Sequence, residues 1–291
     1  MDLIKLNNGL CIPSVGFGTH PQKETLVESA KIAYRVGYRL FDTADNYDNE
    51  EFLGQAVSAH SQHFGDSIFI SKFSQARRTD KLKDCFDESA KKLFGKLDIY
   101  LLHWPYPFLW KAQWRKMEKL YLEGKCKGIG VCNFEVDKLK TLLSFCKVKP
   151  VINQIERHPL FQQQDILDFC KQNEIQVIAY SPTARQDREL YESCELKQLA
   201  DKYNKTINQI ILRWDIDTGT IPIPGSKSEK HIKENFDIDD FHLSQEDIEI
   251  INALECGKRI RFDPKKRFGF KAKVKYALLS LRILIGRSGK A

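Results

Sequence analysis

The sequence lacks the features that mark exported proteins. Residues 1–5 lead directly into polar turn residues, so no secretory signal is expected there. The eight cysteines are scattered along the chain and form no C-x-x-C pair. In a chain of this size without an export signal, such cysteines are expected to be reduced thiols in a cytoplasmic protein.

The sequence also lacks a basic face that could hold nucleic acid. Its net charge is +7, but residues 258–291 alone contribute +11, so the preceding residues carry −4. A nucleic-acid partner would require basic residues interleaved with aromatic residues on the main body, and none are visible. We therefore expect no nucleic-acid partner.

A third absence concerns the dinucleotide-binding motif of doubly wound α/β folds. That motif places three glycines in the pattern G-x-G-x-x-G after the first strand. In this chain residues 16–21 are Gly-Phe-Gly-Thr-His-Pro, and the third glycine is missing. The length of 291 residues instead suits a single α/β barrel, which typically has about 250.

What the chain does contain is a regular alternation of strand-like and helix-like segments. An Asn-Gly turn between residues 3–6 and 10–12 first predicts a β-hairpin. The strands that follow are predicted at residues 15–19, 39–42, 68–72, 99–103, 128–131, 151–155, 175–180 and 220–224. The helices are predicted at residues 24–36, 50–59, 80–94, 112–123, 135–145, 163–173, 194–203, 207–216 and 229–236.

This alternation predicts the fold class. Strands separated by helices pair in parallel through right-handed crossovers, and eight such units close into a barrel. We therefore predict an α/β protein, a (β/α)₈ TIM barrel with an N-terminal β-hairpin over residues 1–264. Residues 265–291 are predicted to form a basic, amphipathic C-terminal extension.

Functional side chains of such a barrel lie at the C-terminal ends of the strands. Asp42, Lys72 and His103 end three consecutive predicted strands, and Tyr47 lies in the loop after the first of them. A phenol has a pKa near ~10 and is a poor proton donor at neutral pH. A nearby lysine would make it a better acid, a carboxylate would keep that lysine charged, and an imidazole could bind a carbonyl oxygen.

Each of these four residues also has an ordinary structural explanation. An aspartate before a loop is usually a cap, a lysine at a strand end is usually solvated, and a loop tyrosine usually packs. All four together at the ends of three consecutive strands favour a catalytic cluster for acid–base chemistry on a carbonyl group.

The motifs around these residues resemble those of the aldo-keto reductases, from the hairpin to about Pro264. They are Phe41-Asp42-Thr43-Ala44 with Tyr47 and Asn49-Glu50, Ser71-Lys72, His103-Trp104-Pro105, Gly128-Ile129-Gly130-Val131-Cys132-Asn133-Phe134, Asn153-Gln154, Ala179-Tyr180-Ser181-Pro182 and Ile223-Pro224-Gly225-Ser226. The resemblance implies that Tyr47 is the general acid, that Lys72 and Asp42 tune it, and that His103 orients the substrate. It also implies hydride transfer from a reduced nicotinamide to an aldehyde, ketone or aldose, with no metal ion.

The resemblance also implies a cofactor site. Tyr180 would stack on the nicotinamide, while Asn133 and Gln154 would bind its carboxamide. The complete set implied is Gly18, Thr19, Asp42, Asn133, Gln154, Tyr180, Ser181, Ser226, Lys227, His231, Glu234 and Asn235. Cys132 stands where the family usually has serine, and a thiol is a weaker hydrogen-bond partner.

The expected phosphate site departs from the family pattern. Gly225 and His231 stand where NADPH-using members typically have lysine and arginine, whereas Ser226 and Lys227 remain available. A 2′-phosphate would be held without a bidentate arginine fork. We expect NADP (as NADPH) to be the preferred cofactor and NAD to be possible.

The substrate pocket is expected to include His20, Tyr47, His103, Trp104 and Trp110. Many members of the family have tryptophan at the position of His20, so this pocket is expected to be more polar on that side. The partner would be a small carbonyl compound. An alternative function is a nicotinamide-sensing regulatory or scaffold protein with incidental turnover. The complete set of Asp42, Tyr47, Lys72 and His103, which we call the tetrad, argues against it.

The tail has one apolar helical face, formed by Val274, Leu278, Leu281 and Ile285, among several basic residues. Three hypotheses remain open for residues 271–285. The segment could pack on the barrel or close the pocket, make a peripheral membrane contact, or form a dimer contact. It is too short and too charged to span a bilayer. We expect a monomer, with a dimer as the alternative.

Overall fold

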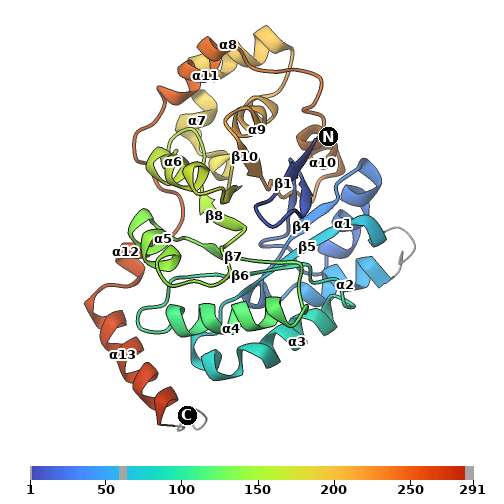
Figure 1. The fold of residues 1–291 in the computed structure, drawn as a ribbon. Coiled ribbons are helices and arrows are strands. Elements are labelled where there is room, and N and C mark those ends of the chain that lie inside the picture. Colours follow the sequence, from blue (N-terminus) through green and yellow to red (C-terminus); the bar gives the residue numbers. More distant parts are fainter. Residues whose placement is uncertain (1, 59–63, 286–291) are drawn as a thin grey trace.

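Eight parallel strands form a single sheet that curls into a barrel in the computed structural model, which describes residues 2–58 and 64–285 (Figure 1). Each strand pairs with the next one along the chain, as expected when a helix follows every strand. The strands are β3 (Phe17–Gly18), β4 (Leu40–Asp42), β5 (Ile68–Phe73), β6 (Ile99–Leu102), β7 (Gly128–Cys132), β8 (Ile152–Glu156), β9 (Gln176–Tyr180) and β10 (Thr220–Pro222). The predicted (β/α)₈ fold is confirmed.

Two backbone hydrogen bonds join the first and last strands of the sheet. The amide of Gly16 donates to the carbonyl of Pro222 at 3.0 Å, and that of Gly18 donates to the carbonyl of Pro224 at 3.0 Å. The backbones approach so closely here that a Cβ on Gly18 would lie 2.6 Å from the carbonyl oxygen of Ile223. Glycine is therefore required where the barrel closes.

Helices surround the barrel, and most lie within about two residues of their predicted bounds. They are α1 (Leu26–Val36), α2 (Glu50–Ser58), α3 (Leu82–Lys92), α4 (Trp110–Leu122), α5 (Val136–Leu143), α6 (Gln164–Gln172), α8 (Cys194–Tyr203), α9 (Ile207–Asp217) and α10 (Glu229–Phe236). The last residue of the predicted helix 50–59 lies outside the described residues. The sequence did not predict α7 (Arg188–Glu192), α11 (Gln245–Asn252) or α12 (Pro264–Arg267). Within the described ranges, no helix combines the length and the apolar character that a membrane span requires.

The predicted hairpin, β1 (Leu3–Lys5) with β2 (Cys11–Pro13), is confirmed and closes one end of the barrel. Its turn is fixed by Asn7 and Asn8, whose side-chain amides donate to the carbonyls of Pro150 and Lys127, just before β8 and β7. Apolar hairpin side chains join the cluster inside the barrel, which includes Leu6, Ile12, Leu40, Ile70, Ile99, Leu101, Ile178 and Ile221. With its N-terminal end closed, the barrel is open only at the C-terminal ends of its strands.

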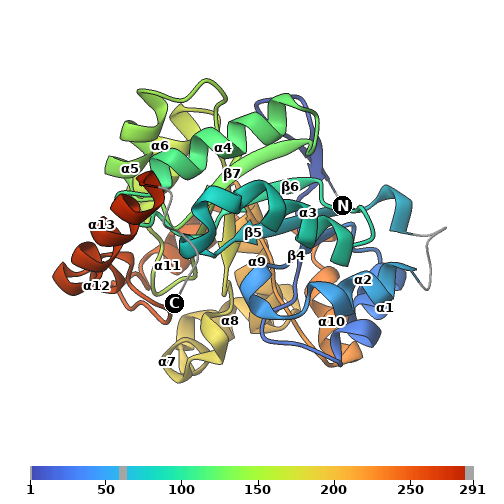
Figure 2. The ribbon, with the colours of Figure 1, turned by 90° about the horizontal axis from the view of Figure 1, so that it is seen from below.

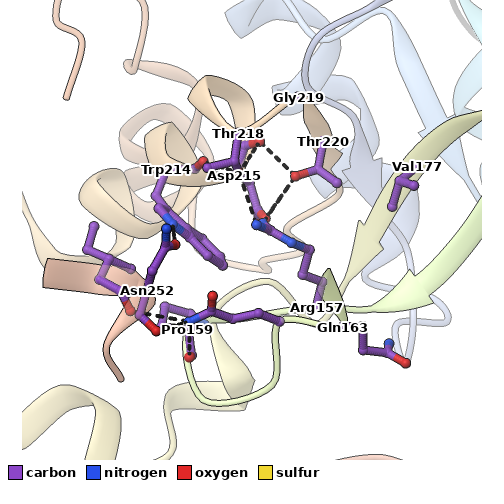
Figure 3. Close-up of polar contacts among 12 residues, drawn as sticks. Arg157, Pro159, Gln163, Val177, Trp214, Asp215, Thr218, Gly219, Thr220 and Asn252 are labelled. Carbon is purple, nitrogen blue, oxygen red and sulfur yellow. Dashed lines mark hydrogen bonds and ion pairs between the residues drawn. The ribbon is translucent and has the colours of Figure 1, made fainter. Parts of the chain in front are cut away.

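A buried polar cluster fixes the chain just after β8 (Figure 3). Arg157 forms an ion pair with Asp215 of α9 and donates to the hydroxyls of Thr218 at 3.0 Å and Thr220 at 3.1 Å. Its guanidinium group lies 3.7 Å from the ring centroid of Trp214. Burial raises the pKa of Asp215 to about 6, against the opposing charge of Arg157. Buried charges require such partners, and this cluster ties β8, α9 and β10 together.

Substituting Gly18→Ala should destabilise the protein, because its Cβ would meet the Ile223 carbonyl at 2.6 Å and force apart the strands that close the barrel. Such overpacking costs about 1–3 kcal/mol, and each kcal/mol lowers Tm by roughly 2–4 °C in a chain of this size. Thermal unfolding followed by circular dichroism measures the change. Gly65→Ala is the matched control, since a Cβ there meets nothing within 4 Å. Equal Tm values for the two variants would contradict this account of closure.

Candidate active site

Lys72 is the centre of a hydrogen-bonded group at the open end of the barrel. Its Nζ donates to Oδ2 of Asp42 at 2.6 Å and to the carbonyl of Thr43 at 2.6 Å, and lies 3.5 Å from the hydroxyl of Tyr47. The Tyr47 ring also meets the His103 ring edge-on, with centroids 5.7 Å apart. The structure thus brings together the four residues expected at the strand ends. Asp42 ends β4, Tyr47 ends the 3₁₀ turn Asp45–Tyr47, Lys72 lies in β5 and His103 directly follows β6.

The charges of this group depend on one another. Burial would lower the pKa of Lys72, but the carboxylate of Asp42 raises it above its ordinary value, so the amine stays protonated. The second oxygen of Asp42 accepts a hydrogen bond from Gln154 at 2.7 Å. Burial raises the pKa of the Tyr47 hydroxyl, and the positive charge of Lys72 opposes that shift. The Lys72 ammonium group therefore makes the Tyr47 hydroxyl more acidic than burial alone would leave it.

His103 is held by two partners. Its Nδ1 lies 2.6 Å from Oγ of Ser74, and its carbonyl accepts from the Asn133 side chain at 3.0 Å. Burial, then the charges of Lys72 and Arg267, lowers the pKa of His103 well below its ordinary value, so the ring is neutral. Ser74 was not predicted from the sequence, although it lies two residues beyond Lys72 and side chains alternate with that period along an extended segment.

A cavity of about 650 Å³ opens above the tetrad, within the size range of small-molecule sites. Residues expected from the sequence that line it are Gly18, Thr19, His20, Asp42, Tyr47, His103, Trp104, Asn133, Gln154, Tyr180 and Ser181. The hydroxyl of Tyr180 donates to Oδ1 of Asn133 at 2.7 Å, which fixes both side chains. The expected nicotinamide contacts therefore share one cavity with the tetrad.

The structure places one expected pocket residue away from the wall of the described cavity. Trp110 is not at the cavity wall; it begins α4, where its ring packs against Phe134 and Phe145 with centroids 5.4 and 5.7 Å away. Conversely, the cavity wall includes three arginines that the sequence analysis did not name: Arg185, Arg261 and Arg267. They lie in the loop after β9 and in the segment after α11, and no sequence spacing linked them to the tetrad.

The residues expected at the phosphate end follow Gly225 of the cavity wall in the chain, in the loop after β10 and in α10. They are Ser226, Lys227, His231, Glu234 and Asn235. Asn235 is buried, and its Oδ1 has no hydrogen-bond partner within the part of the chain that the structure describes. A buried acceptor without a partner in α10 is compatible with a polar ligand such as the adenosine end of a nicotinamide dinucleotide.

Close approach of the backbone explains why glycine occupies position 225. A Cβ there would lie 2.3 Å from the carbonyl oxygen of Gly18, so a lysine cannot be accommodated without moving the closure of the barrel. Any phosphate group at this end must be bound by other residues, among them Ser226, whose Oγ already accepts from the amide of Ser228 at 3.1 Å.

The chain is similar along most of its length to proteins of known activity. A sequence model of the "Aldo/keto reductase family" matches residues 12–255. A glyoxal reductase of Bacillus subtilis is 39% identical over 267 residues, covering 90% of this chain and 96% of the relative. A methylglyoxal reductase, DkgA, of Escherichia coli K12 is 37% identical over 266 residues, with 90% and 96% coverage.

Solved structures agree with this similarity. The crystal structure of an aldo-keto reductase from a Medee basin deep-sea metagenome library has a TM-score of 0.86 at 35% identity, covering 89% of this chain and 97% of that one. A Bombyx mori aldo-keto reductase in complex with NADP has a TM-score of 0.85 at 30% identity, with 90% and 95% coverage. This chain therefore belongs to the aldo/keto reductase family of oxidoreductases.

Proposed function

We propose that the protein uses NADPH to reduce an aldehyde or ketone to the alcohol, with Tyr47 as the general acid. The observation that carries this proposal is the position of Lys72, hydrogen-bonded to Asp42 at 2.6 Å and within 3.5 Å of the Tyr47 hydroxyl. Relatives named glyoxal reductase and methylglyoxal reductase support carbonyl reduction as the reaction class. The reduced nicotinamide supplies the hydride when it is bound.

The side chains supply the proton and hold the substrate. In the tautomer of His103 whose Nδ1 accepts a hydrogen bond from the Ser74 hydroxyl, the ring carries its hydrogen on Nε2. That N–H donates a hydrogen bond to the substrate carbonyl oxygen. The Tyr47 hydroxyl then transfers its proton to that oxygen as negative charge develops there. The Lys72 ammonium stabilises the resulting phenolate, and solvent returns the proton to Tyr47 after the alcohol leaves.

The cofactor preference follows from charges near α10. Lys227 is exposed beside Ser226 and offers a positive charge to a 2′-phosphate. His231 follows in the first turn of α10. These groups favour NADPH over NADH, but they lack the fixed two-donor geometry of an arginine. NADH is therefore a usable, poorer cofactor.

The arginines at the cavity wall indicate the substrate class. Asp42, which is committed to Lys72, is the only acid among the described residues at this wall, whereas Arg185, Arg261 and Arg267 all line it. Burial, then the charges of Arg261 and Arg185, lowers the pKa of His20 to about 4, so the field in the cavity is positive. A carbonyl compound that carries a carboxylate or phosphate group suits this field.

Arg261 is the arginine best fixed for this role. The buried carboxylate of Glu156, at the end of β8, accepts hydrogen bonds from the amides of Ile260 at 2.6 Å and Arg261 at 2.8 Å. This anchors the C-terminal segment over the cavity. Because its backbone is held by a strand end, Arg261 can present its guanidinium group to a substrate without first ordering a loop.

The protein is inferred to act in the cytoplasm as a monomer on a small carbonyl compound. All eight cysteines are free thiols, as expected in a reducing compartment. Four of them, Cys85, Cys126, Cys132 and Cys170, are buried, and burial raises the pKa of each. Such thiols are inert structural residues.

Tyr47→Phe should abolish turnover without preventing cofactor binding, because it removes the transferable proton and leaves the ring in place. A general acid contributes roughly 10²–10⁴-fold, so kcat should fall by that factor when loss of NADPH absorbance is followed with methylglyoxal. NADPH affinity, measured by quenching of tryptophan fluorescence, should stay the same. Tyr34→Phe on the surface of α1 is the control. An unchanged kcat in Tyr47→Phe would refute the assignment, and absence of wild-type turnover on any aldehyde would favour a cofactor-sensing role.

Lys227→Gln should weaken use of NADPH more than use of NADH. An exposed charge contact contributes on the order of 1 kcal/mol, so kcat/KM for NADPH should drop about fivefold while that for NADH stays constant. Lys83→Gln on the far surface of α3 removes the same charge and serves as the control. A wild-type enzyme that prefers NADH by about a hundredfold would overturn the NADPH assignment, because that gap corresponds to almost 3 kcal/mol.

Arg261→Gln should discriminate between charged and neutral substrates of the same shape. A hydrogen bond to a charged group contributes about 1.5–3 kcal/mol, so kcat/KM for 4-carboxybenzaldehyde should fall at least about tenfold. The value for its methyl ester, methyl 4-formylbenzoate, should change little, and so should the Kd for NADPH. Arg188→Gln, outside the cavity, is the charge-matched control. Equal losses on acid and ester, or a matching loss of NADPH affinity, would show that Arg261 does not bind the substrate.

A further inference from the structure

The helix α13 (Phe270–Leu284) has one face fixed against the barrel. Ala272, Tyr276, Leu279 and Ile283 pack against an apolar cluster that contains Trp104, Tyr106, Leu109 and Phe268. The Tyr276 ring lies 5.3 Å from the Tyr106 ring and 5.8 Å from the Phe268 ring, centroid to centroid. In both views the helix lies at the outside of the molecule, at the C-terminal end of the described chain (Figure 1 and Figure 2).

The opposite face of α13 is also apolar, but it is exposed. Its side chains follow a spacing of four, four, three and four residues, which keeps them on one side of a helix. Their exposed fractions are 82% for Phe270, 45% for Val274, 56% for Leu278, 57% for Leu281 and 64% for Ile285. Single exposed apolar residues are ordinary, but a continuous outward stripe marks an interaction surface. We call these five residues the outer stripe.

Basic residues border the outer stripe. Lys271, Lys275 and Arg282 lie along one edge of it, and Lys273 lies on the other side. No acidic residue follows Asp263 in the sequence. Residues 258–291 carry +11 while the preceding residues carry −4. The surface that surrounds the outer stripe is therefore positive, and α13 itself offers no charge to neutralise it.

We propose that α13 docks the protein on a bilayer surface that contains anionic phospholipid. The outer stripe enters the boundary between headgroups and acyl chains, while the bordering lysines and arginine bind lipid phosphates. This combination of an apolar face and flanking basic residues is the one that interfacial helices use. The helix lies in the plane of the membrane, held there by its inner face on the barrel.

Charge complementarity selects lipid over a second copy of this chain. Packing two outer stripes together about a twofold axis would bring the basic edges of the two helices near each other. Like charges at such spacing repel, and α13 supplies no acid to offset them. An anionic lipid surface instead buries the outer stripe and at the same time pairs its phosphates with the bordering basic residues.

Sedimentation of the full-length protein with vesicles tests the proposal. Wild-type protein should bind vesicles of phosphatidylcholine and phosphatidylserine in equal parts, bind phosphatidylcholine vesicles far less, and be released by high salt. Leu278→Ser with Leu281→Ser should weaken binding at least about tenfold for each leucine, since each loses its apolar burial. Lys271→Gln, Lys275→Gln and Arg282→Gln should each weaken it about fivefold.

Leu122→Ser is the matched control, because Leu122 is 68% exposed on α4 and lies outside α13. It should bind vesicles as the wild type does. Circular dichroism and aldehyde turnover show that the variants remain folded, since none of the substituted residues belongs to the cavity. Failure of the wild type to bind, or equal binding to both kinds of vesicle, would overturn the proposal. A concentration-dependent dimer in light scattering that Leu278→Ser with Leu281→Ser dissolves, without vesicle binding, would assign the outer stripe to a second copy instead.

Discussion

The buried ion pair between Lys72 and Asp42 is the interaction on which the rest of the site depends. Lys72 is fully buried, and an ammonium group there without a partner would lose its proton. Removal of one partner from such a pair costs roughly 3–5 kcal/mol, because the other charge is left buried. The two side chains come from neighbouring strands, and Gln154 of β8 holds the second carboxylate oxygen. The arrangement of β4, β5 and β8 and the protonation of the lysine are therefore one constraint.

Much of this arrangement could be predicted from the sequence, because it rests on short-range patterns. An apolar segment followed by Asp42, Lys72 or His103 predicted each strand and its end to within one residue. The parallel order then follows from the alternation with helices. Motif resemblance added Asn133, which directly follows β7, and Gln154, which lies within β8. Such positions are fixed by the barrel itself, and for that reason they could be read from the sequence.

The arginines at the cavity wall could not be predicted in this way. Arg261 reaches the cavity only because Glu156, 105 residues earlier, accepts its backbone amide. Nothing in the local sequence of residues 258–262 indicates that contact. Trp110 illustrates the reverse case, because this aromatic residue follows β6 in the chain but lies in α4 and packs against Phe134. Periodicity also placed Val274, Leu278, Leu281 and Ile285 on one helical face, which the structure shows exposed, but it could not show that the opposite face of α13 packs on the barrel.

The two halves of the site have different mechanical supports. Asp42 and Lys72 lie on strands β4 and β5, which the hydrogen-bonded sheet keeps rigid. The other wall depends on the C-terminal segment: Arg267 lies 4.4 Å from the Trp104 ring centroid, and Phe268 joins Trp104 to Tyr276 of α13. Trp104 in turn stacks beside His103 at 5.9 Å. These contacts form a continuous chain from α13 through Phe268 to Trp104 and Arg267 at the cavity wall, whereas Asp42 and Lys72 are positioned by the strands.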